Sequence, residues 1–334
     1  MAAWICWGFM VFWILGAWGW WSFERAWAGP SLSWGCKHGV DLLRVKLGSS
    51  RDEIGISSPA EANPEGPMSF DLGKKQEIYI LDHVNRRIQV FVHGSRIRGI
   101  PLPPEGVFSD MALLPEGQLA LLDNSAKKAL FILKEDGSLL SVLPLKGAGI
   151  TSAEEVAGIY VQSQGKLAGI WANLGARSVR LAHLDGSADP ERISVPGILS
   201  FHGDRLLRAE KIGDVTVVVQ SSQKEKFSIW SQSTVHVEMF VEGVREVAQD
   251  RQSRIYLVLG LLDEKDRPLD LVMILDPQGK PLGRLELCRP QTSHEMHRRV
   301  RISPEGEIFQ MGLEKKGLFI KRFDTRSILD KASR

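Results

Sequence analysis

Residues 78–82 read Ile-Tyr-Ile-Leu-Asp, and a related stretch, Leu-Ala-Leu-Leu-Asp, returns at residues 119–123, 41 positions later. At the same spacing Arg86-Arg87 is matched by Lys127-Lys128, and a turn containing Gly follows in both copies. Short apolar runs bounded by turn residues are typical of β-strands. The sequence therefore predicts a repeated β-unit of about 40 residues.

Weaker copies of this unit occur at residues 158–187 and 300–320. Each copy holds three or four expected strands, which is the size of one blade of a β-propeller. A blade buries its two apolar faces by stacking against its neighbours around an axis. Residues 67–324 hold six units of about 43 residues, so we predict an all-β, six-bladed β-propeller. The less regular residues 198–288 leave a count of seven open.

The segment before the first full unit also contains an expected strand, at residues 40–47. We expect this strand to complete the last blade and close the ring, which removes exposed sheet edges. Residues 48–66 are rich in Ser, Pro, Glu and Gly and are expected to form a surface connection. Residues 29–66 thus comprise the closing strand and this connection, and residues 325–334 form a C-terminal tail.

Residues 1–28 differ in composition from the rest of the chain. Seven of the ten Trp residues lie in the first 27 positions, and no charged residue precedes Glu24. The triplet Ala26-Trp27-Ala28 has the small-x-small pattern of a signal-peptidase site, so we expect cleavage after Ala28 and export to the periplasm or the extracellular space. The apolar run 2–23 is also long enough to span a bilayer. An uncleaved N-terminal membrane anchor is therefore the alternative.

The charge balance narrows the classes of partner. The chain has 42 Lys and Arg against 40 Asp and Glu, a net charge of +2. This excludes a polybasic nucleic-acid-binding tail and an acidic disordered chain. Outside the leader only Trp34, Trp171 and Trp230 remain, too few for a surface that stacks sugars or single-stranded nucleic acid. We expect no nucleic-acid partner.

Two cysteines, Cys36 and Cys288, lie outside the leader. In an oxidising compartment they would form one disulfide that closes a loop of about 250 residues. The alternative is two unrelated thiols.

One unit of the chain resembles a known repeat family. The run Gly66-Pro67-Met68-Ser69-Phe70, the strand 77–82 and the run Asn85-Arg86-Arg87-Ile88-Gln89-Val90-Phe91 resemble an NHL repeat. The match is good at residues 66–92 and partial at 108–140. The resemblance implies a six-bladed propeller used mainly as a binding platform. It also implies that relatives of the wider fold include lyases and lactonases that bind a divalent metal in the axial channel.

Basic residues recur at the hairpin between the second and third strands of the units. Equivalent turns of successive blades lie on one face of a propeller, so these charges would form an arc that attracts phosphate, sulfate or carboxylate groups. The alternative is a set of solvated hairpin tips with acidic neighbours. The candidate residues are Arg86, Arg87, Lys127, Lys128, Arg177, Lys315 and Lys316.

Catalytic and metal-binding patterns are weak. Asp82 and Asp123 occupy equivalent strand ends, where Asp typically hydrogen-bonds the following turn, so we interpret them as structural. The run 294–297, His-Glu-Met-His, lacks the i, i+4 spacing of a zinc-protease motif, and we interpret it as a polar loop. Isolated histidines such as His83, His183 and His202 would be ligands only if they converged. We predict no catalytic residue, metal ligand or cofactor.

These observations predict an exported NHL-like β-propeller that acts as a binding or scaffold module. Its partner would be a protein or an anionic envelope ligand, such as a glycan or a lipid headgroup. The alternative is an exported metal-dependent lyase or lactonase-type enzyme with its site in the axial channel. These two classes are separated by whether the purified protein holds a stoichiometric Ca²⁺ or Zn²⁺ ion.

Overall fold

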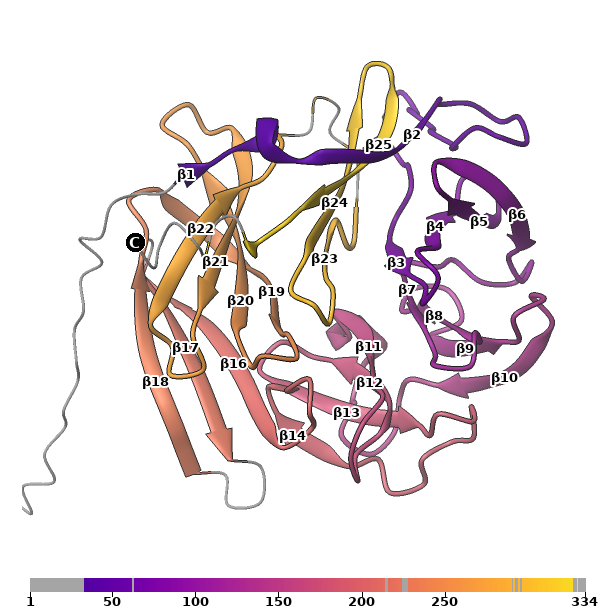
Figure 1. Ribbon diagram of the computed structural model, residues 1–334. Coiled ribbons are helices and arrows are strands. Elements are labelled where there is room, and N and C mark those ends of the chain that lie inside the picture. Colours follow the sequence, from indigo (N-terminus) through magenta and orange to yellow (C-terminus); the bar gives the residue numbers. More distant parts are fainter. Residues whose placement is uncertain are drawn as a thin grey trace, which may run out of the picture.

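The computed structural model describes residues 33–61, 63–213, 216–223, 228–289, 291, 294, 296–326 and 329. The expected leader, residues 1–28, and most of the expected tail lie outside these ranges. The described residues form six β-sheets arranged in a ring, antiparallel except for one short parallel strand, and two single-turn 3-10 helices, η1 (Cys36–His38) and η2 (Ala153–Glu155) (Figure 1). The described part of the chain contains no helix with the length and apolar character of a membrane span. The predicted six-bladed β-propeller is confirmed.

Each blade is built from four consecutive strands, except that the last blade takes its outer strand from the start of the chain and blade 5 gains a short fifth strand from there. Blades 1 to 3 contain β3 (Phe70–Leu72), β4 (Ile78–Asp82), β5 (Arg87–Val92) and β6 (Ser95–Pro101); β7 (Asp110–Leu113), β8 (Leu119–Asp123), β9 (Ala129–Leu133) and β10 (Leu139–Pro144); and β11 (Gly158–Gln162), β12 (Gly169–Asn173), β13 (Arg177–Ala182) and β14 (Ser194–Pro196). Blades 4 to 6 contain β15 (Ile198–Leu199), β16 (Arg205–Ile212), β17 (Thr216–Gln223) and β18 (Ser228–His236); β19 (Phe240–Gln249), β20 (Ile255–Leu262), β21 (Pro268–Leu275) and β22 (Pro281–Glu286); and β23 (Val300–Ile302), β24 (Ile308–Glu314), β25 (Gly317–Phe323) and β2 (Val40–Val45).

The ring is closed by the N-terminal strand. β2 pairs antiparallel with β25, from Val40 opposite Arg322 to Val45 opposite Leu318. A shorter strand, β1 (Ser33–Trp34), pairs parallel with the outer strand β22 of blade 5. Between these two strands a disulfide joins Cys36 to Cys288. The N-terminal segment is thus attached to both of the last two blades, as Figure 1 shows.

The axis of the ring is lined by the first strands of the blades. β7 contacts both β3 and β11, and β23 contacts β3. Since neighbouring strands are antiparallel, the turns between second and third strands share one face with the connections between blades. We call this the hairpin face. The turns between first and second strands, for example residues 73–77 and 303–307, lie on the opposite face, which we call the cavity face.

Blades 4 and 5 differ from the others in strand length. Their strands β16 to β21 have 8 to 10 residues. Their facing sides form one large apolar cluster that includes Leu207, Val219, Leu257 and Leu271. The longer strands shift the turns relative to the 41-residue spacing, and this explains why residues 198–288 look irregular in sequence.

The connection at residues 48–66 is not wholly on the surface, unlike the expectation. Ile54 is fully buried in the core between blades 1 and 6, and its backbone bridges to Leu47. The following amide, Gly55 N, donates a hydrogen bond of 2.8 Å to the buried Asp82 carboxylate. Ile54, with Ile56 packed beside it and the hydrogen bond of Gly55, anchors the connection to the propeller.

Candidate functional site

Charged side chains from four blades meet near the axis of the propeller. Asp71 is on β3, Asp110 is on β7 and Glu246 is on β19, all of them first strands. Arg301 is on β23, and Arg298 comes from the connection just before it. The short first strands β3, β7 and β23 are apolar apart from these residues, so the charges are a distinctive feature of the channel.

Asp110 is fully buried and has all of its acceptor positions occupied. Its Oδ1 accepts hydrogen bonds from the Ser69 hydroxyl at 2.7 Å and from its neighbour Met111 N at 2.9 Å. Its Oδ2 accepts from Ile159 N at 3.0 Å and lies 2.8 Å from Arg298 Nη2. This carboxylate therefore connects blades 1, 2 and 3 with the connection that leads into blade 6.

The protonation of Asp110 beside Arg298 depends on burial and on the neighbouring cations. Burial opposes ionisation of Asp110, but the cations beside it, chiefly Arg298, outweigh burial and lower its pKa. His297 Nε2 lies 3.8 Å from the same carboxylate. Burial lowers the pKa of His297 in spite of that carboxylate, which favours the neutral imidazole. Asp110 and Arg298 are thus a charged pair with a neutral histidine beside them.

A second pair lies next to the first. Arg301 Nε is 3.2 Å from Asp71 Oδ1, and its guanidinium donates to the carbonyls of Phe70 at 2.9 Å and Met111 at 3.0 Å. Asp71 Oδ2 in turn accepts from Leu113 N at 2.9 Å. These contacts join β3, β7 and β23, so Arg301 links the last blade to the first two.

Glu246 is the exception among the axial charges. No described residue donates a hydrogen bond to its carboxylate or places a cation within ion-pair distance of it. Burial raises its pKa, and the nearby Arg298 and Arg301 offset this only in part. The pairing of β19 with β20 shifts register between Val244 and Glu246, which is a β-bulge. Bulges redirect side chains and are common next to functional sites.

The unpaired state of Glu246 makes a prediction about stability. A carboxyl group whose pKa is higher in the folded than in the unfolded protein destabilises the fold as the pH rises above the unfolded value of about 4.3. We therefore expect Glu246→Gln to raise the Tm at pH 7, with the gain disappearing below about pH 4. Thermal unfolding across this pH range measures it. A Tm that falls equally at all pH values would contradict the prediction.

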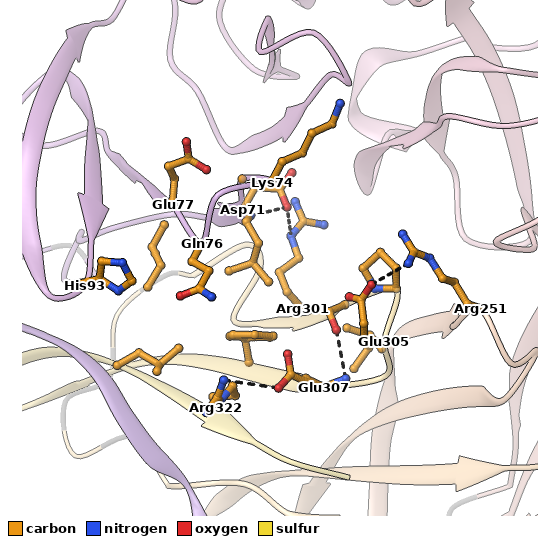
Figure 2. Close-up of a pocket in the computed structure, with 18 of the residues that line it drawn as sticks. Asp71, Lys74, Gln76, Glu77, His93, Arg251, Arg301, Glu305, Glu307 and Arg322 are labelled. Atoms are coloured by element: carbon orange, nitrogen blue, oxygen red, sulfur yellow. Dashed lines mark hydrogen bonds and ion pairs between the residues drawn. The ribbon is translucent and has the colours of Figure 1, made fainter. Parts of the chain in front are cut away.

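A cavity of about 670 Å³ opens beside this cluster on the cavity face. It lies between blades 1, 5 and 6, and Glu246, Asp71 and Arg301 are among its lining residues. Figure 2 shows two further ion pairs in it, Arg251 with Glu305 at 3.0 Å and Arg322 with Glu307 at 3.5 Å. Its apolar wall is formed by Leu42, Leu72, Ile78, Ile302, Pro304 and Phe309.

The predicted basic residues lie on the hairpin face, opposite the cavity, and most of them have acidic partners. Lys127 Nζ is 3.2 Å from Glu105 and Lys128 Nζ is 2.5 Å from Glu154. Arg177, Arg87 and Arg86 are also engaged: Arg177 pairs with Glu155 at 3.0 Å, Arg87 pairs with Asp82 at 3.0 Å, and Arg86 donates to the carbonyls of Gly106 and Pro103. Lys315 and Lys316 are exposed in the turn between β24 and β25, and no described carboxylate lies within ion-pair distance of them.

The repeated aspartates have the predicted structural role. Asp123 accepts hydrogen bonds from four backbone amides, those of Val107, Ser125, Ala126 and Lys127. Asp82 accepts from Gly55 N and from the side chains of Asn85, Arg87 and Gln89. Both carboxylates hold the hairpin after the second strand of their blade.

The candidate metal ligands do not converge. His83 follows β4, His183 follows β13 and His202 lies between β15 and β16, in three different blades. His294 Nε2 lies 3.4 Å from the Pro67 carbonyl, and Cys288 is bonded to Cys36. Across the described residues, no three His, Cys, Asp or Glu side chains gather as a metal site.

Sequence reasoning missed the axial charges. The sequence predicts a polar loop at residues 294–297 and a repeat unit that starts with a strand at residue 300. In the structure, His297, Arg298 and Arg301 from this region lie at the channel. A signal was present, because Asp71 and Arg301 each interrupt an apolar first strand of three residues. Nothing in the sequence indicated which carboxylate pairs with which arginine.

No protein-family model matches the chain, and no curated protein sequence does. Among solved structures it is similar to Kuenenia stuttgartiensis hydrazine synthase, with a TM-score of 0.51, 9% identity, and 78% of this chain and 81% of that chain covered. It is also similar to virginiamycin B lyase from Staphylococcus aureus (TM-score 0.42, 12% identity, 78% and 95% covered) and to the WD40 repeats of RRP9 (TM-score 0.48, 10% identity, 83% and 99% covered). At such identities the similarity extends to the propeller fold alone. The likeness to NHL repeats stays a resemblance at residues 66–92.

Proposed function

We propose that the protein is an exported NHL-like β-propeller that acts as a binding or scaffold module at the cell envelope, for a protein or an anionic ligand. The observation that carries this proposal is the state of Asp110. Its carboxylate is the most deeply buried one in the channel, and every contact it makes is to the protein itself. A metal-dependent propeller enzyme would need such a carboxylate free to bind its ion. Here it connects the blades instead.

Export is supported by two features. The Cys36–Cys288 disulfide fits an oxidising compartment, where such bonds persist. The apolar leader with its Ala26-Trp27-Ala28 triplet fits a cleaved signal. Mass spectrometry of the mature N-terminus tests this part: Gly29 as the first residue indicates release, and an intact leader indicates a membrane tether.

Metal analysis separates the binding module from the alternative enzyme. For the binding module we expect the purified protein to hold no stoichiometric Ca²⁺ or Zn²⁺, and EDTA to leave its Tm unchanged. The comparison of Tm with and without EDTA is a sensitive test, because an ion present at a hundred times its Kd adds about 2.7 kcal/mol to the free energy of unfolding. A stoichiometric ion together with a Tm that drops on chelation would favour the lyase or lactonase-type enzyme.

The hairpin face is the surface we propose for an anionic ligand, with Lys315 and Lys316 as its unpaired cations. We expect replacement of Lys127, Lys128, Lys315 and Lys316 by Ser to lower the salt concentration at which the protein leaves a heparin column, because surface cations supply this attraction. The matched control is Lys74→Ser with Lys75→Ser, which removes exposed lysines from the cavity face. Equal retention of both variants and of the wild type would exclude this face.

A further inference from the structure

The cavity contains one charge that the protein does not balance. Among its lining residues, Asp71 is matched by Arg301, Glu305 by Arg251 and Glu307 by Arg322. Lys74 and Glu77, both at the turn between β3 and β4, offset one another in sign. With histidine counted as neutral, the lining is left with a net charge of −1, which belongs to Glu246.

The channel above the cavity does not supply the missing cation. Arg298 is fixed on Asp110 at 2.8 Å and on the Ile159 carbonyl at 2.8 Å. Arg301 is fixed on Asp71 and on two backbone carbonyls. Both arginines lie near enough to Glu246 to offset its burial in part, but their ion pairs and hydrogen bonds are made with blades 1 to 3 and not with Glu246. An isolated carboxylate in such a partly buried place is costly unless a cation joins it.

The wall of the cavity indicates what kind of cation would fit. Six apolar side chains line it together with the carboxylate, and among them Leu72 and Ile302 come from first strands next to the channel. A cation that carries methylene groups can bury its chain along such a wall while its charged end meets the carboxylate. A bare metal ion would leave the wall uncovered, and Glu246 alone would give it a single ligand. The volume of about 670 Å³ is in the usual range for small-molecule sites.

We propose that this cavity binds one ammonium or guanidinium group carried on an aliphatic chain, with the Glu246 carboxylate as its partner. The group belongs either to a small free amine or to a lysine or arginine side chain of a bound protein. The inference goes beyond the proposed function, since it concerns the cavity face and holds whether or not the hairpin face binds anions.

The test is calorimetric titration of the full chain with n-butylammonium. n-Butanol and sodium butyrate, which have the same chain without the positive charge, are the ligand controls. We expect saturable binding of the ammonium and a loss of about tenfold or more in affinity in Glu246→Gln, because a hydrogen bond to a charged group is removed. Glu238→Gln, which removes the same charge at an exposed position between β18 and β19, is the matched control and should bind like the wild type.

A second arm distinguishes the two sources of the cation. A short acetylated peptide with one central lysine is compared with the same peptide carrying acetyl-lysine. Preference for the lysine peptide over butylammonium assigns the site to a protein partner, and the reverse assigns it to a small amine. Absence of binding of both probes to the wild type, or equal binding by Glu246→Gln, overturns the proposal. Either result leaves the heparin and metal tests of the proposed function unaffected.

Discussion

Replacing Cys36 and Cys288 with Ser is expected to lower the free energy of unfolding by about 2–5 kcal/mol. The bond connects two cysteines that are 252 residues apart, so it removes a large amount of chain entropy from the unfolded state. It also fastens the segment that holds β1 and β2 to the connection after blade 5. Without it, the closing strand is kept in the ring by strand pairing, by the packing of Leu43 and Val45 and by ion pairs to blade 6.

Urea denaturation of the oxidised wild type and the double Ser variant measures this effect. We expect the variant to fold, since its other native contacts remain, and to unfold at a lower urea midpoint than the oxidised wild type. The internal control is dithiothreitol, which should lower the midpoint of the wild type toward that of the variant and leave the variant unchanged. A variant as stable as the oxidised wild type would show that the bond adds nothing to stability.

Asp110→Ala is expected to lower the free energy of unfolding by about 3–5 kcal/mol, because it leaves Arg298 as an uncompensated charge in a buried place. Replacement of both partners, Asp110→Leu with Arg298→Met, should recover much of this loss, since apolar substitution of a whole buried pair is often tolerated. The matched control is Glu105→Gln, which breaks the exposed pair with Lys127 and should cost about 1 kcal/mol or less.

The same pair gives a pH dependence with a definite sign. The pKa of Asp110 is lower in the folded protein than its ordinary value, because the Arg298 charge outweighs burial. Its stabilising contribution is therefore complete above the unfolded value of about 3.9 and is lost as the pH falls through the lower folded value. The Leu/Met double variant lacks this titrating carboxylate, so its free energy of unfolding should fall less than that of the wild type as the pH is lowered below about 4.

The parts of the fold that were predictable are those with a local physical cause. Asp82 and Asp123 were visible as a repeat because the hairpin after the second strand needs an acceptor, for backbone amides at Asp123 and for the side chains of Asn85 and Arg87 at Asp82. The same chemistry recurs at Asp263, which accepts from Lys265 N and Arg267 N after β20, but the longer strands of blade 5 shift it out of phase. The length of the repeat and the presence of a closing strand could thus be predicted, because both depend on turn residues and on the apolar runs between them.

The axial site was not predictable because its contacts are long-range. Arg301 meets Met111, and Arg298 meets Ile159, across more than a hundred residues of chain. Arg301 is on the first strand of the last blade and Arg298 is in the connection before it, and neither position is basic in the copies at residues 78–82 and 119–123 that define the repeat. The basic arc, in contrast, was visible as a pattern, but the glutamates that pair with it lie in the next blade or in connections. A repeat shows equivalent positions, not their partners.

The closing strand also has a kinetic consequence. Val40 must find Arg322 before the ring exists, and a chain that has not done so exposes the edge of β25 to other molecules. Pairing over such a distance is slow in the reduced chain, because the search spans nearly the whole sequence. Once Cys36 is bonded to Cys288, β2 begins 4 residues from the bond and its partner β25 begins 29 residues from it. Oxidation therefore turns this pairing into the closure of a much shorter loop, and an early disulfide would shorten the time during which the open ring can aggregate.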